Sequence, residues 1–177
     1  FVQTGVNSFD EIMVSGNSAA SNADTIIFNV LAAFYTACAT FAGQNLGARN
    51  RKRVLKSYLV SLTYATAAAL ILGIILILSG REFLSLFTSK GAVIDAGMER
   101  IGIMWFSFAV VPLMDCTISA SRGIGKSLVP TIIVIMGSCV FRVIWVYTIF
   151  AYFHTIPSLY LLYIFSWFIT AVAEIIY

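Results

Sequence analysis

Asp115 lies in an apolar stretch where an acid could bind a cation or exchange a proton. Residues 102–130 read GIMWFSFAVVPLMDCTISASRGIGKSLVP, so apolar and small residues lead through Asp115 to a basic end at Arg122 and Lys126 and to Pro130, which we expect to stop the helix. A charged aspartate in hydrocarbon costs on the order of 3 kcal/mol, so it normally faces a bundle interior or a wet cavity. Asp115 is therefore our candidate for a cation-coupling residue.

A structural role for Asp115 is the alternative. Ser119 and Arg122 lie four and seven positions further on, so the three side chains share one face of a helix. Arg122 could reach back along that face and offset the carboxylate. Both interpretations remain open at the level of the sequence.

The composition indicates the environment of these residues. The chain is 60% hydrophobic and only 11% charged, and its mean hydropathy is +0.93. A soluble domain of this length would need more polar surface, so we expect an integral protein of the lipid bilayer. The net charge of +3 comes from basic residues gathered in two short loops, so we expect no nucleic-acid partner.

Five apolar segments are long enough to cross a bilayer at about 1.5 Å per residue. They predict an all-α membrane protein, and we treat residues 1–177 as a single partial transmembrane lobe. The chain does not begin with methionine and ends within an apolar run, so we expect a piece of a longer polypeptide. The predicted spans cover about residues 25–46, 58–78, 96–121, 128–150 and 158–177.

Basic residues in the first loop predict the orientation. Five of them follow the first span with no acid among them, and such loops are normally cytoplasmic. With Arg122 and Lys126 also inside, the amino terminus lies outside and the carboxyl terminus inside. The residues of this cytoplasmic topology loop are Arg49, Arg51, Lys52, Arg53 and Lys56.

Three further polar residues are candidates for the substrate or its pathway. Arg142 lies roughly 21 Å above the inner end of its span, too deep for its side chain to reach the cytoplasmic surface. It needs a partner or water, as a structural anchor or as a pathway residue. Asn29 lies at nearly the same depth. Asp24 has capping-box spacing from Ser21, so a helix cap is the alternative to a substrate or ion role.

Several chemistries are not supported. Residues 120–127, ASRGIGKS, fit a relaxed phosphate-loop pattern, but an apolar span precedes them instead of a strand. His154 is the only histidine, so neither a catalytic triad nor a multi-histidine metal site can form. The three cysteines fall in apolar spans without metal spacing, and we expect free buried thiols. The sequence thus predicts no enzyme, no metal and no cofactor.

The ordered motifs resemble those of the multidrug and toxic compound extrusion (MATE) family of secondary transporters. They are GQNLGAR at 43–49, RGIGKSLVP at 122–130 and FRVIW at 141–145. The resemblance implies two six-helix bundles around a cavity that opens alternately to each side. It implies that this chain supplies five helices of the carboxyl-terminal bundle, so the amino-terminal lobe of the same polypeptide is an expected partner.

The resemblance also implies a function. Members of the family exchange protons or sodium ions for cationic or amphipathic drugs across the cell membrane, and in some members a carboxylate at the position of Asp115 takes part in coupling. The family's other coupling acid lies on the helix missing from this chain. Two alternatives remain. One is a lipid-linked oligosaccharide flippase of related architecture, which is supported only by Arg142. The other is a non-transporting membrane scaffold.

Overall fold

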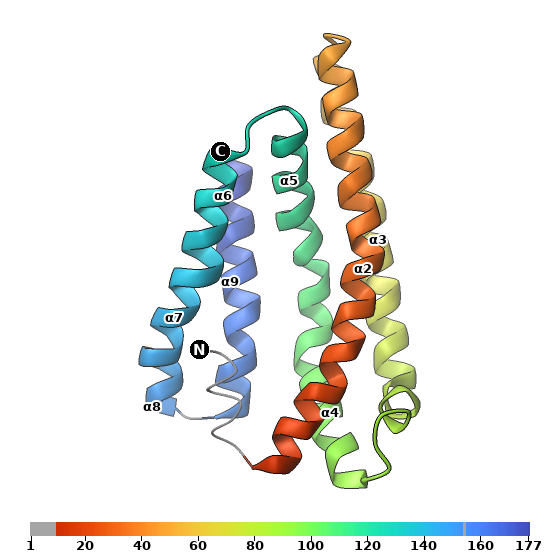
Figure 1. The fold of residues 1–177 in the computed structure, drawn as a ribbon, viewed down its shortest axis with the longest axis vertical. Coiled ribbons are helices and arrows are strands. Elements are labelled where there is room, and N and C mark those ends of the chain that lie inside the picture. The colour runs from red at the N-terminus through yellow and green to blue at the C-terminus, as the bar shows by residue number, and fades with distance from the viewer. Residues whose placement is uncertain (1–9, 154) are drawn as a thin grey trace.

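The computed structural model describes residues 10–153 and 155–177, and all regular structure in these residues is helical. Four helices are long and apolar enough to cross a membrane, and a bent pair makes a fifth passage if it is one span. Successive passages run in opposite directions (Figure 1). The prediction of an all-α fold with membrane-length helices is confirmed, whereas His154 lies outside the described residues.

The first passage is α2 (Glu11–Gly47), a helix of 37 residues. The carboxylate of Asp10 caps it by accepting a hydrogen bond from the backbone nitrogen of Met13 at 2.9 Å. Because the helix begins at this cap, it starts well before the predicted residue 25. The predicted cap at Ser21 and Asp24 is wrong, since both residues lie inside α2.

A tight turn joins α2 to α3 (Arg51–Ser85). Arg49 adopts a left-handed backbone conformation with φ of 57°, and the side chain of Asn50 caps α3 by accepting from the nitrogen of Arg53 at 3.1 Å. Within α3 the backbone is kinked at Ser79, whose hydroxyl donates to the carbonyl of Ile75 at 2.7 Å. The second passage thus extends beyond both ends of the predicted span.

The third passage is broken, whereas the sequence predicted one helix over 96–121. It consists of α4 (Gly91–Met104), the 3-10 segment η1 (Trp105–Ala109) and α5 (Val111–Gly123), with a bend of 42°. Pro112 lies in the first turn of α5 and has no backbone N–H to continue the hydrogen-bond ladder. The break therefore follows from a proline that the apolar pattern concealed.

The fourth passage is a continuous helix of alternating geometry. Its segments are α6 (Leu128–Val134), the π-helical η2 (Ile135–Val140), α7 (Phe141–Trp145), the π-helical η3 (Val146–Phe150) and α8 (Ala151–Phe153). Pro130 lies in the first turn of α6 and does not stop the preceding helix, which already ends at Gly123. The last passage is α9 (Ile156–Ile176).

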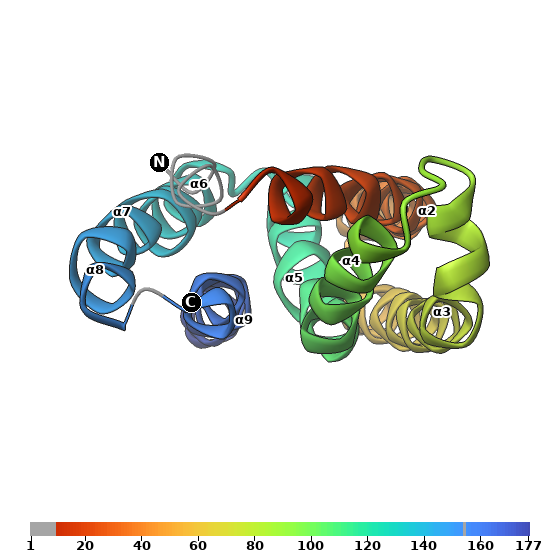
Figure 2. The ribbon, with the colours of Figure 1, turned by 90° about the horizontal axis from the view of Figure 1, so that it is seen from below.

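The helices form two groups, which Figure 2 shows from below. In one group α2 packs against α3, α4 and α5; in the other the α6–α8 helix packs against α9, and α9 joins the groups by packing against α5. Close approach of α2 and α5 depends on glycine. A Cβ atom on Gly123 would overlap the backbone of Ala39, and one on Gly43 would lie 2.8 Å from the carbonyl oxygen of Gly123.

Candidate functional site

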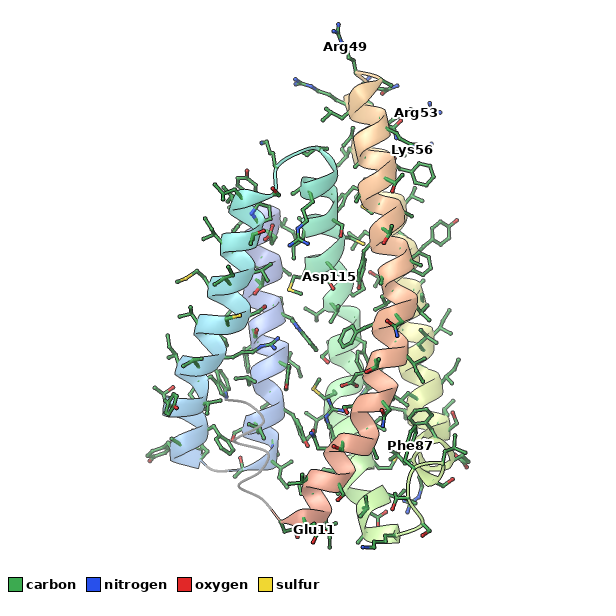
Figure 3. The ribbon with its side chains drawn as sticks, in the orientation of Figure 1. Glu11, Arg49, Arg53, Lys56, Phe87 and Asp115 are labelled. Atoms are coloured by element: carbon green, nitrogen blue, oxygen red, sulfur yellow. The ribbon has the colours of Figure 1, made fainter. Side chains whose placement is uncertain are left out.

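Asp115 lies on α5 near the middle of the bundle (Figure 3). Its side chain is half-buried, and neither of the two salt bridges between described residues involves it. Arg122 acts on Asp115 electrostatically but is not within salt-bridge distance. The predicted compensation along the helix face therefore acts without a direct ion pair, which leaves the carboxylate without a salt-bridge partner among the described residues.

A phenol from α2 borders the same region. The hydroxyl of Tyr35 is buried and has no hydrogen-bond partner in the described part of the chain. Asp115 and Cys116 are the groups that act on it electrostatically. An ionisable carboxylate on α5 and a neutral oxygen on α2 thus lie near enough to interact electrostatically, without a hydrogen bond between them, and such oxygens are suitable ligands for a small monovalent cation. We call Asp115 and Tyr35 the inner cluster.

Hydrogen bonds fix α5 on either side of Asp115. The hydroxyls of Tyr58 and Thr117 share a hydrogen bond of 3.0 Å, which ties α3 to α5. The thiol of Cys38 lies 3.7 Å from the carbonyl oxygen of Cys116, which ties α2 to α5. Cys38 and Cys116 are free buried thiols as predicted, whereas Cys139 is exposed in this chain.

Asp24 lies in a second cluster that the sequence interpretation did not identify. Its carboxylate accepts a hydrogen bond and forms a salt bridge with Arg100 of α4, and the two side chains are only 14% and 7% exposed. Two further nitrogens of Arg100, Nε and Nη1, are buried without a partner among the described residues. Asp24 therefore has its cation inside the protein.

Two polar residues complete this outer cluster of Asp24, Arg100, Asn17 and Tyr160. The guanidinium of Arg100 lies over the ring of Tyr160, 5.7 Å from its centroid. The hydroxyl of Tyr160 donates to Oδ1 of Asn17 at 3.3 Å. These contacts join α2, α4 and α9 around one arginine, so the cluster holds three helices together.

Arg142 lies on α7 and is directed to α9. Its Nε donates to the hydroxyl of Ser166 at 3.0 Å, and its guanidinium carbon lies 4.7 Å from the ring centroid of Tyr163. Asn29 is exposed on α2, while Ile27 and Leu31, two positions on either side, are buried. The structure therefore does not bring Asn29 and Arg142 together.

The basic loop lies at one end of the molecule, which we call the basic end. Figure 3 shows Arg49, Arg53 and Lys56 there, with Glu11 and Phe87 at the opposite end. The loop between α5 and α6 also lies at the basic end (Figure 1). This arrangement is compatible with a common cytoplasmic side, which stays a prediction.

Sequence reasoning missed Arg100 and the burial of Glu174. Arg100 lies inside the predicted third span, and a cation at that depth, some 22 Å from Asp115 along a helix, indicates an acid on another helix. That argument would have led to Asp24. Glu174 of α9 is 2% exposed, and neither of its carboxylate oxygens has a hydrogen-bond partner among the described residues.

The fold and these clusters define a multi-pass membrane protein with charged groups between its helices. The family model described as MatE matches residues 2–148, which is most of the chain. The chain therefore belongs to the MATE family of transporters. A search of the curated proteins finds no match.

Two solved structures share this fold. The MATE transporter ClbM, solved in complex with Rb⁺, is 22% identical with a TM-score of 0.88, and the match covers 98% of this chain and 40% of that one. A MOP superfamily transporter from Pyrococcus furiosus, in which reversed polarity of the binding pocket suggested a different function, is 18% identical with a TM-score of 0.86; the match covers 99% of this chain and 39% of that one. The chain thus spans about two fifths of the length of these transporters, and the likeness shows the fold alone.

Proposed function

We propose that the transporter containing this chain is a cation-coupled antiporter that exports drugs or other cationic or amphipathic organic compounds by alternating access. The observation that carries the proposal is the half-buried carboxylate of Asp115, which has no salt bridge to a described residue. Such a carboxylate is stabilised when a proton or metal cation binds to it. Asp115 is then the residue loaded by the coupling cation.

The inner and outer clusters support different roles for their two acids. A cation that reached Asp24 would have to displace Arg100, and the released guanidinium would be left buried beside Tyr160 without its acid. Loading of Asp115 requires no such exchange. We therefore assign the coupling cation to the inner cluster and a fixed charge pair to the outer cluster.

The coupling ion is a proton or a sodium ion. Both are small cations that a carboxylate accepts, and the phenol oxygen of Tyr35 would supply a second ligand for sodium. The complex of ClbM with Rb⁺ is an example of an alkali cation held by a transporter of this fold. No cofactor and no catalytic residue are part of the proposal.

Alternating access then arises from coupled equilibria. Loading of Asp115 stabilises one conformation of the lobe, and binding of the organic substrate stabilises another. The amino-terminal lobe of the same polypeptide supplies the other wall of the cavity. We place the complete protein in the plasma membrane, where export lowers the cellular concentration of the substrate.

The experiment measures export of a fluorescent organic cation from cells that express the full-length protein. Proton and sodium gradients are collapsed in turn, which names the coupling ion. Asp115→Asn should abolish gradient-driven export, because the amide is similar in shape but cannot be charged. Asp95→Asn is the matched control, since Asp95 lies on α4, is 63% exposed and forms its salt bridge among the described residues with the equally exposed Arg81.

Coupled export that survives in Asp115→Asn would refute the assignment of Asp115. If the wild-type protein exports none of a broad set of organic cations under either gradient, the antiporter proposal itself fails. The lipid-linked oligosaccharide flippase would then be the next function to test, with transfer of a labelled pyrophosphate-linked lipid between leaflets as the readout.

A further inference from the structure

Arg142 differs from the other membrane-embedded arginine of this chain. Arg100 is neutralised by Asp24, whereas no described carboxylate lies within salt-bridge distance of Arg142. The titratable groups that act electrostatically on Arg142 are Tyr163 and Cys139, which supply no carboxylate. A charged arginine within the membrane has a high free energy when no acid neutralises it. A bound anion would lower that free energy.

The guanidinium of Arg142 is held in place by α9. Its Nε donates to Ser166 at 3.0 Å, and the hydroxyl of Ser166 in turn donates to the carbonyl oxygen of Gly137 at 2.9 Å. The ring centroids of Tyr163 and Trp167 lie 4.7 and 5.8 Å from the guanidinium carbon. These contacts use Nε and the π-faces, while no described residue accepts a hydrogen bond from Nη1 or Nη2.

The helix around Arg142 has an irregular backbone. The five residues of α7 lie between two π-helical segments, Ile135–Val140 and Val146–Phe150. Such wide turns are rare in helices overall. Where they occur, they are often found at functional sites. At the first of them α9 comes so close that a Cβ atom on Gly137 would overlap the hydroxyl of Thr170.

We propose that Arg142 forms an anion subsite that binds a carboxylate of the transported compound. The two Nη nitrogens present a planar pair of donors, the geometry that matches both oxygens of a carboxylate. The aromatic rings of Tyr163 and Trp167 offer apolar surface beside it. The substrate class would then be amphipathic zwitterions, with an acid that pairs with Arg142 and a cationic part elsewhere on the molecule.

This inference rests on the proposed export function and narrows its substrate. Arg142 could instead be neutralised by an acid from the rest of the transporter. The two cases differ in a measurable way: a substrate subsite affects only compounds that carry a carboxylate, whereas an internal ion pair affects every substrate.

The test compares two dyes of nearly the same shape, a rhodamine with a free carboxylate and its ethyl ester, in cells that express the full-length transporter. Arg142→Gln should lower export of the free acid about tenfold or more, because it removes a charge-assisted pair of hydrogen bonds. Export of the ester should stay within about twofold of wild type. Arg142→Lys keeps the positive charge but loses the planar pair of donors. Its export of the free acid should lie between that of wild type and that of Arg142→Gln.

Two controls separate a loss of binding from a loss of folding. Arg81→Gln removes an exposed arginine from the end opposite the basic loop and should change neither dye. Ser166→Ala removes the acceptor that positions Nε, so it should lower the preference for the acid by less than Arg142→Gln does. If Arg142→Gln fails to appear as a monodisperse protein, Arg142→Lys and Ser166→Ala carry the comparison.

Equal losses for both dyes would overturn the subsite and indicate an internal ion pair. Unchanged export of both would overturn it as well. If the wild-type transporter exports the ester but discriminates against the acid, the substrate class is wrong while the antiporter proposal stands. If it exports neither dye nor any other organic cation, the antiporter proposal fails first.

Discussion

Asp24 and Asp115 are both carboxylates inside apolar helices, and their surroundings differ. Asp24 meets Arg100 in a buried pair closed by Tyr160 and Asn17. Asp115 has no salt bridge to any described residue. The outer carboxylate is neutralised by an arginine within the lobe, whereas the inner one has no salt-bridge partner among the described residues and is, in our proposal, loaded by the coupling cation.

The difference has a consequence for how a transporter uses acids. A buried charge pair is costly to open, since either partner left alone remains desolvated. An uncompensated carboxylate keeps a high free energy until a cation arrives, which makes it responsive to the ion gradient. We therefore propose that the outer cluster holds the lobe together and that the inner cluster binds the coupling cation.

The largest effect is expected from breaking the outer pair. In the full-length transporter Arg100→Met should lower the free energy of unfolding by about 3 to 5 kcal/mol, because Asp24 then stays buried without its cation. Arg81→Met, which breaks the 63%-exposed pair with Asp95, should cost less than about 1 kcal/mol. Thermal unfolding of the purified protein in detergent measures both.

The double variant Asp24→Asn with Arg100→Met sharpens this prediction. Since it leaves no unpaired charge, it should recover most of the stability lost in Arg100→Met. If Arg100→Met were as stable as Arg81→Met, the outer cluster would not hold the lobe together and the contrast between the two carboxylates would disappear.

A smaller loss of stability is expected from a substitution that pushes α5 away from α2. Gly123→Ala should cost about 1 to 3 kcal/mol, because the added methyl group overlaps the backbone of Ala39. The same change should reduce coupled export, since it shifts Asp115 relative to Tyr35. Unfolding temperature and dye export are measured on the same preparation.

Gly47→Ala is the matched control, because nothing lies within 4 Å of a Cβ atom at that position. In α2 it should leave stability unchanged or raise it by up to about 1 kcal/mol. Were Gly123→Ala equally harmless, the close crossing of the two helices would not position the inner cluster.

Much of the fold could be predicted from hydropathy because membrane-length apolar runs need helices to satisfy their backbone. The ends and breaks of the helices could not be predicted from hydropathy. The cap at Asp10 precedes the apolar run, so α2 begins earlier than hydropathy alone suggests. The break at Pro112 lies within a stretch that hydropathy assigns to one span, and it bends the passage that carries Asp115.

The candidate site was only partly predictable. Asp115 could be singled out because it is an acid in the middle of an apolar run, away from either end of its span. Its neighbour Tyr35 could not, since a tyrosine in an apolar helix gives no sign of which helix its hydroxyl faces. Arg100 and Asp24 are 76 positions apart, and only the packing of α4 on α2 pairs them.

The smallest effect on stability is expected at the inner cluster itself. Tyr35→Phe removes a buried hydroxyl that has no partner among the described residues, so stability should stay within about 0.5 kcal/mol of wild type or rise slightly. Tyr160→Phe is the control, because its hydroxyl donates to Asn17 and its loss should cost about 1 kcal/mol. Thermal unfolding separates the two.

For export, the order of the two variants should be reversed, with the larger loss in Tyr35→Phe. If the oxygen of Tyr35 is a ligand for the coupling cation, Tyr35→Phe should weaken sodium-driven export several-fold, whereas Tyr160→Phe should leave it close to wild type. Proton-driven export needs only the carboxylate of Asp115 and should survive the loss of the phenol. A large loss of stability in Tyr35→Phe would mean that the hydroxyl has a partner elsewhere in the transporter, and Asp115 would then have to hold its cation without it.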